Sequence, residues 1–310
     1  MSSNKKNHAW LKLIAMTLLM AIGIAGHAAD DETLYKPYIL ASNAPGSLPA
    51  VISKTRDALT ANGFQIAGEY SPYDGAEVIV VTNRELKRVA AQTDFGGYGA
   101  IQRVSVTNSG GKIQVAYTNP LYMQYSYRLK GDLSGVAAKL KAALGAEQEF
   151  GSKGLTAREL LHYHYKIFMP YFDESYKLKK FGSYSDALKA VEQGLAQHRG
   201  GTSKVYRVDI PGKQQSVFGV ALTEGSSGDK FIMDKIDIGD LKATPHLPYE
   251  ILVSGNQVYA LAVKFRIAQS FPDLSMIGRG GFFSIQCAPS AIKDELYKVV
   301  GRKSGEDDMF

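Results

Sequence analysis

Cysteine is nearly absent from this chain of 310 residues, which contains Cys287 alone. An intramolecular disulfide is therefore excluded, even in an oxidising compartment. Proline is also sparse, with 11 residues, and 45% of the side chains are apolar. This composition excludes an intrinsically disordered chain and indicates one large domain or two of ordinary size.

Motifs specific to an enzyme family are missing as well. No Gly-x-Ser-x-Gly elbow occurs, and the spacing of Ser290 and Lys293 lacks the companion motifs of penicillin-binding proteins. Asp234, Asp237 and Asp240 recur every three residues without the glycine of a calcium loop, which indicates a charged loop. We therefore expect no cofactor, no metal ion and a non-catalytic protein.

The chain also lacks an apolar run long enough to span a bilayer. Its N-terminal run, Leu13 to Gly26, has 14 residues, whereas a membrane-spanning helix needs about 20. Three lysines precede this run, and Gly26 and Ala28 place small residues at the end of it. This layout is typical of a secretory signal peptide. We predict a signal peptide over residues 1–28, export to the periplasm, and no stable membrane anchor after cleavage.

Charge of one sign is not concentrated anywhere in the chain. The net charge is +6, and loss of the three lysines of residues 1–28 leaves 33 basic against 30 acidic side chains. A small surplus spread along the chain argues against nucleic-acid binding. The single basic cluster, residues 177–180, is predicted to be a solvated strand edge. The partners expected are a small ligand, of unknown identity, or an envelope protein.

Internal repetition is the most informative positive feature. Amphipathic helices over 48–59 and 184–195, capped by Ser47 and Ser183, match in apolar spacing at an offset of 136. A second pair, over 136–144 and 292–300, matches at an offset of 156, and each helix stops at a glycine. Each half also has strand-like segments between its helices: 64–70, 77–82, 101–107 and 112–118, then 204–210, 216–222, 249–253 and 257–265.

These patterns predict an α+β fold of two tandem β-α-β4-α-like units with antiparallel sheets, joined by a bridging helix. Thr156 and Glu159 form a capping box at the start of that helix, which should end before Pro170. The predicted divisions are a first unit over 30–149, the bridging segment 150–171, a second unit over 172–303 and a flexible tail over 304–310.

Several short segments resemble the domain of unknown function 302 family. In the second half, residues 185–197 read SDALKAVEQGLAQ and precede a strand and Phe218-Gly219-Val220. In the first half, LTANGF over 59–64 precedes a strand, and YTNP over 117–120 closes a later one. The resemblance implies a β-α-β4-α layout like that of the TATA-box-binding protein. The first half departs from the family at residues 85–91, which are predicted to form an inserted helix. The family has no agreed activity, so the resemblance implies no catalytic residue.

Two histidines and one cysteine are the candidates for chemistry. His162 and His164 lie two residues apart, so on a helix they point in different directions and could not easily bind one ion. His164 falls on the apolar stripe of the predicted helix and is expected to be half-buried, whereas His162 faces solvent. Cys287 is expected to be a small buried residue at a strand end. The alternatives are an envelope enzyme that uses Cys287 or His164, and a metal carrier that uses both histidines.

Two glycine-rich loops are the candidates for ligand binding. Residues 95–99 and 278–283 place flexible backbone beside aromatic rings. Tyr98, Phe282 and Phe283 could stack on a ligand at the mouth of a pocket, and Arg279 could pair with an anion. The alternative is ordinary turns with core aromatics. The ligand-binding residues predicted are therefore Tyr98, His164, Arg279 and Phe282, in a groove between a unit and the bridging helix.

Overall fold

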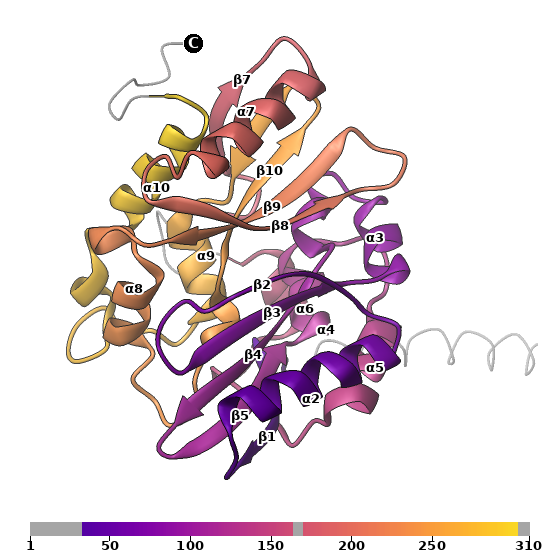
Figure 1. Ribbon diagram of the computed structural model, residues 1–310, viewed down its shortest axis with the longest axis vertical. Helices are drawn as coiled ribbons and strands as arrows, with labels where there is room; N and C mark the ends of the chain where they lie inside the picture. Colours follow the sequence, from indigo (N-terminus) through magenta and orange to yellow (C-terminus); the bar gives the residue numbers. More distant parts are fainter. Residues whose placement is uncertain (1–32, 164–169, 303–310) are drawn as a thin grey trace, which may run out of the picture.

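The structure, a computed structural model, describes residues 33–163 and 170–302 (Figure 1). The predicted signal peptide, the predicted tail and His164 lie outside the described residues. Within the described ranges, no helix combines the length and the apolar character needed to cross a membrane.

The first unit contains a six-stranded antiparallel sheet in the order β2-β3-β4-β5-β1-β6. Helices α2 and α5 contact each other and pack on this sheet (Figure 1). Helix α3 and the short helix η1 are inserted between β3 and β4, and α4 follows β5. The elements of this unit are β1 (Tyr38–Ala44), α2 (Leu48–Ala61), β2 (Gln65–Tyr70), β3 (Ala76–Thr82), α3 (Arg84–Ala90), η1 (Gly96–Gly99), β4 (Gln102–Ser109), β5 (Lys112–Thr118), α4 (Pro120–Ser126), α5 (Ser134–Leu144) and β6 (Gln148–Phe150).

The second unit contains a five-stranded antiparallel sheet in the order β7-β11-β10-β9-β8. Helices η2, α8 and η3 are inserted between β9 and β10, and α9 follows β11. Its elements are β7 (Tyr176–Lys180), α7 (Tyr184–Ala196), β8 (Thr202–Asp209), β9 (Gln215–Leu222), η2 (Gly225–Ser227), α8 (Asp229–Ile236), η3 (Thr244–His246), β10 (Tyr249–Ser254), β11 (Gln257–Ala260), α9 (Val263–Ser270), η4 (Phe282–Ile285) and α10 (Ala288–Val299).

The two units share one topology, and the predicted α+β class is confirmed. Written from its other edge, the second sheet has the order β8-β9-β10-β11-β7. The first sheet has the same order, β2-β3-β4-β5-β1, when β7 is matched with β1, β8 with β2, and so on along the chain. Strand β6 is an addition to the first sheet. The inserted helix predicted over 85–91 is α3, and α8 occupies the same place in the second unit. The insertion is therefore common to both halves.

Local signals account for most of these elements. The Ser183 hydroxyl accepts a hydrogen bond from the Asp186 N–H at 3.1 Å and caps α7. Ser47 precedes α2 as expected, but its side chain makes no capping bond. Gly110 and Gly111 both have positive φ in the two-residue turn between β4 and β5, a conformation that favours glycine.

Two predicted elements differ in the structure. The strand predicted over 257–265 ends at Ala260, and a buried helix, α9, begins at Val263. The bridging helix is α6 (Ala157–Leu161), which has the predicted capping box but ends eight residues earlier than expected. Residues 164–169 of the predicted helix lie outside the described residues.

Equivalent elements of the two units meet each other. Strands β2 and β8 lie side by side at their sheet edges, and each has a bulge at the contact, at Ala67 and Val205. A Cβ atom on Gly68 would overlap the carbonyl oxygen of Val205, so glycine permits this approach. Helix α4 contacts its counterpart α9 through the Tyr122 hydroxyl, which donates to the Gln269 carbonyl at 2.8 Å. The units are thus joined by a polar and closely packed interface.

The inserted segments are also exchanged between the units. Helix η1 of the first unit packs on β9 and β10 of the second, and η3 of the second packs on β3, β4 and β5 of the first. The hydrophobic core follows the same pattern, because the cluster beneath the first sheet includes Val217, Leu252 and Phe265 from the second unit. The second cluster, mostly of the second unit, likewise includes Tyr38, Leu40 and Ala116 from the first, so each core contains side chains of both units.

Candidate functional site

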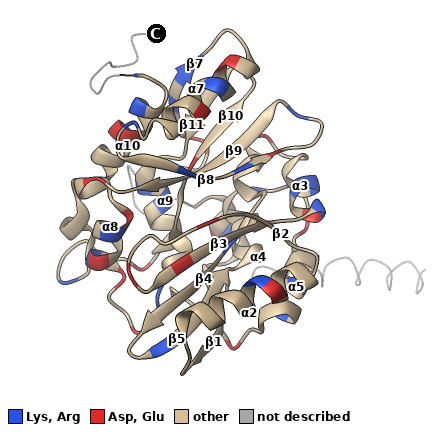
Figure 2. Cartoon of the chain, in the orientation of Figure 1, with Lys and Arg blue, Asp and Glu red and all other residues tan. Residues whose placement is uncertain are grey.

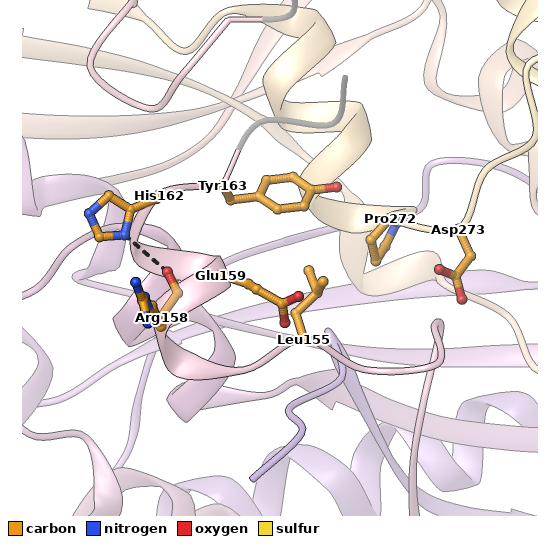
Figure 3. Close-up of a pocket in the computed structure, with 7 residues that line it drawn as sticks. All are labelled: Leu155, Arg158, Glu159, His162, Tyr163, Pro272 and Asp273. Carbon is orange, nitrogen blue, oxygen red and sulfur yellow. Dashed lines mark hydrogen bonds between the residues drawn. The ribbon is translucent and has the colours of Figure 1, made fainter. Parts of the chain in front are cut away.

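A pocket of about 590 Å³ lies between α6 and the segment that follows α9. Figure 3 shows Arg158 and His162 on one side, Pro272 and Asp273 on the other, and the Tyr163 ring above. Leu155 and Glu159 complete its lining. We call this pocket the α6 groove. It occupies the place predicted for a ligand site, between a unit and the bridging helix.

The polar side chains that line the α6 groove differ in how many hydrogen bonds and ion pairs they already form. The Glu159 carboxylate accepts the Thr156 N–H at 2.7 Å and is committed to the helix cap. The Asp273 carboxylate accepts one backbone N–H, from Lys153 at 2.7 Å. Arg158 is exposed and forms no ion pair with any described residue. The guanidinium of Arg158 is therefore the free cation of the groove, and Asp273 is an acceptor opposite it.

His162 lies at the end of α6, where it faces solvent as the sequence predicted. Its Nδ1 is 3.0 Å from the Arg158 carbonyl oxygen, which makes Nδ1 the N–H donor and places the lone pair of the neutral ring on Nε2. His164 lies outside the described residues. In residues 33–163 and 170–302, no three His, Cys, Asp or Glu side chains lie close enough together to hold one metal ion.

The first glycine-rich loop, residues 95–99, is buried between the units. Tyr98 is fully buried and packs against Tyr127 and Phe172, so it does not lie at a pocket mouth as predicted. The Gly97 N–H donates to Gln215 Oε1 at 2.9 Å across the interface. A Cβ atom on Gly97 would lie 2.6 Å from a methyl carbon of Leu252. Here the glycines serve close packing.

The second glycine-rich loop is on the surface. Arg279 is exposed and lines a separate pocket of about 330 Å³. Phe282 is half-buried and packs against the core of the second unit, whereas Phe283 is 54% exposed. The predicted residues Tyr98 and Phe282 thus lie in different hydrophobic clusters, and the two loops do not form one site.

Cys287 is exposed, which corrects the prediction of a buried residue at a strand end. It occupies the N-cap position of α10, where a helix begins instead of a strand ending. Burial therefore does not remove the alternative of a cysteine nucleophile. Among the described histidines, however, none hydrogen-bonds to Cys287: His198 contacts the Thr202 carbonyl, and His246 contacts Arg266.

Sequence reasoning missed a buried cluster of charged side chains between the units. Arg103 of β4 and Arg266 of α9 both bind the carboxylate of Glu250 on β10, and all three side chains are at most 4% exposed. The Tyr206 hydroxyl donates to the same carboxylate at 3.2 Å. His246 Nδ1 lies 3.1 Å from an Arg266 nitrogen. Burial and the Arg266 charge lower the pKa of His246, so its neutral ring accepts this bond.

Two aspartates of the second unit have raised pKa values. Burial raises the pKa of Asp229 to about 7, although the Tyr70 hydroxyl of the first unit donates to it at 3.0 Å. Burial also raises the pKa of Asp237 to about 6, and both of its oxygens accept the Ala243 N–H at 3.0 Å. Both carboxyl groups form structural hydrogen bonds. Asp229 lies in the contact between the units, and Asp237 lies in the loop after α8.

Comparison with known proteins adds no relative, because no family model, no curated protein and no solved structure matches the chain. The resemblance to the domain of unknown function 302 family stays a prediction. With no matching protein to indicate a ligand, the geometry of the α6 groove carries the functional argument.

Charged side chains of both signs are interspersed over both units (Figure 2).

Proposed function

We propose that the protein is a non-catalytic, periplasmic binding or accessory protein that holds a small anionic ligand, or an anionic group of a partner protein, in the α6 groove. The observation that carries this proposal is the free Arg158 guanidinium at the wall of the 590 Å³ pocket. A guanidinium offers several N–H donors in one plane and suits a carboxylate or phosphate. A pocket of this volume fits a small molecule.

The opposite wall adds selectivity to the proposed site. Asp273 accepts a single backbone N–H and retains lone pairs for an N–H or O–H group of a ligand. The Tyr163 ring and Pro272 line the groove and provide its apolar surface (Figure 3). A ligand with an anionic group at one end and an N–H or O–H donor at the other could bind Arg158 and Asp273 together.

Native mass spectrometry of the full protein from its own host, with elemental analysis of the same sample, tests the proposal. We expect a co-purifying organic molecule, and its loss in Arg158→Gln. Arg88→Gln is the matched control, because Arg88 is an exposed arginine on α3 with no ion pair to a described residue. An apo mass in the wild type, or equal occupancy in both variants, would contradict a tightly held ligand in this groove.

The alternative of an envelope enzyme uses Cys287 or His164, and its Cys287 form is tested separately. Because the side chain is exposed, we expect a thiol reagent to modify the native protein completely. The binding proposal predicts that Cys287→Ser retains the co-purifying molecule. Loss of a measured turnover activity in Cys287→Ser, with the fold intact, would favour the enzyme.

A further inference from the structure

The second pocket lies where the two units face each other, away from the α6 groove. Its walls come from the β2–β3 turn and the end of β4 in the first unit, and from α8, the following loop and Arg279 in the second. We call it the inter-unit pocket. It is lined by Tyr73, Thr107, Asn108, Met233, Asp234, Asp237, Ile238, Lys242 and Arg279.

Hydrogen bonds across the interface hold the walls of this pocket in place. The hydroxyls of Tyr73 and Thr107 both contact Thr244 Oγ1, at 2.8 Å and 3.0 Å. Below them, the Gln114 side chain bonds to both the N–H and the carbonyl of Lys242, each at 2.8 Å. Hydrogen bonds therefore fix the loop at Lys242 and Thr244 against the first sheet, so the pocket is already formed without a ligand.

The charges at the pocket leave one cation without a partner. Asp234 is paired with Lys230, and the Lys242 ammonium donates to the Asp237 carbonyl at 3.0 Å. Arg279 is exposed and forms no ion pair within residues 33–163 and 170–302. An anionic group in the pocket could therefore form an ion pair with the Arg279 guanidinium.

The rest of the lining suits hydroxyl groups and one small apolar face. The Asn108 side chain is exposed, and Asp237 is a nearly buried carboxylate whose lone pairs are only partly used by the Ala243 N–H. A carboxylate accepts hydrogen bonds from hydroxyl groups, and an amide both accepts from them and donates to them. Met233 and Ile238 offer apolar contact beside them.

We propose that the inter-unit pocket binds a small polyhydroxylated anion of about the size of one acidic sugar. Arg279 binds the anionic group, Asn108 and Asp237 bind the hydroxyls, and Ile238 contacts the carbon skeleton. The volume of about 330 Å³ is at the lower end for ligand sites and fits one ring. This site is independent of the α6 groove, so either proposal can fail alone.

Isothermal titration calorimetry on the full chain tests the inference, with glucuronate, glucose and inorganic phosphate as probes. We expect glucuronate to bind, and glucose to bind at least about tenfold more weakly because it lacks the charge for Arg279. Phosphate should also bind about tenfold more weakly, since it cannot use the hydroxyl-binding side. Absence of glucuronate binding at 10 mM (roughly the weakest affinity a ligand site would show), or equal binding of phosphate, would overturn the proposal.

Variants assign the binding to this pocket. We expect Arg279→Gln to weaken glucuronate binding about tenfold and Asn108→Ala to weaken it less, because a charged hydrogen bond contributes more than a neutral one. Both side chains are exposed, so both variants should keep the thermal midpoint of the wild type. Arg88→Gln is the control, because Arg88 lines neither pocket, and it should bind glucuronate as the wild type does. Unchanged binding in Arg279→Gln would overturn the assignment.

Discussion

The two glycine-rich loops have similar compositions and opposite surroundings. In residues 95–99, the glycines allow a backbone to touch the other unit, and Tyr98 is buried beneath them. In residues 278–283, nothing approaches the Gly278 position, and Arg279 and Phe283 face solvent. The same residue types therefore serve close packing at the interface between the units and an open pocket rim at the surface. Variants at the interface should affect stability, and variants at the rim should affect binding.

Removal of the Glu250 carboxylate should produce the largest effect. Glu250→Gln leaves Arg103 and Arg266 buried with too little negative charge, and the unpaired charge should lower the free energy of unfolding by about 3–5 kcal/mol. Urea denaturation followed by circular dichroism measures this change. A partly exposed cluster gives the control: Glu192→Gln, which loses its contacts to Lys204 and Arg207, should cost less than about 1 kcal/mol. Equal losses would remove the distinction between interface and surface.

A side chain at Gly97 should produce the next largest effect. Gly97→Val forces Leu252 and Gln215 apart, and overpacking of this kind should cost about 3 kcal/mol. Gly278→Val has free space around it and meets only the cost of its positive φ of 88°, about 1–2 kcal/mol. Thermal unfolding of the two variants compares the loops directly. A smaller loss of stability in Gly97→Val than in Gly278→Val would show that residues 95–99 are not closely packed against the second unit.

Asp229 should make stability depend on pH in an unusual direction. Its folded pKa is raised from 3.8 to about 7, so its contribution is fully present below pH 3.8 and is lost as the pH rises through 7. In Asp229→Asn, we expect the decline in stability between pH 4 and 7 to be smaller by an amount on the order of 3 kcal/mol. Asp234→Asn, at an exposed position paired with Lys230, should leave the decline unchanged. An equal pH dependence of stability in Asp229→Asn and the wild type would contradict the raised pKa of Asp229.

The sequence predicted the elements whose signals are local. The cap at Ser183 and the turn at Gly110 and Gly111 depend on neighbouring residues alone, and both are present. The strand predicted through Phe265 was wrong because Val263, Phe265 and Ile267 alternate with polar residues, as in a half-buried strand. In α9 the polar residues after the exposed Lys264 are buried too, and Arg266 has Glu250 as its partner. A segment buried on nearly all sides loses the periodicity that distinguishes a helix from a strand.

The candidate sites could be predicted less well than the fold. Arg103 and Glu250 are 147 residues apart, and no local pattern shows that they meet. Tyr98 was expected at a pocket because glycine and aromatic residues are typical of both ligand loops and tight packing. The start of α6 was predicted from the capping box at Thr156, but Arg158 and Asp273 come together only through the contact between α6 and the segment after α9.

The contact between β2 and β8 has a consequence for how the chain avoids aggregation. Both are outermost strands, and an uncovered outer strand offers its free N–H and C=O groups to other chains. In the full chain each of these edges is shielded by the other unit at Gly68 and Val205. The opposite edges are a strand of three residues, β6, and the lysine-rich β7, which both discourage strand addition. Division of the gene between its halves would therefore yield two aggregation-prone fragments instead of two working domains.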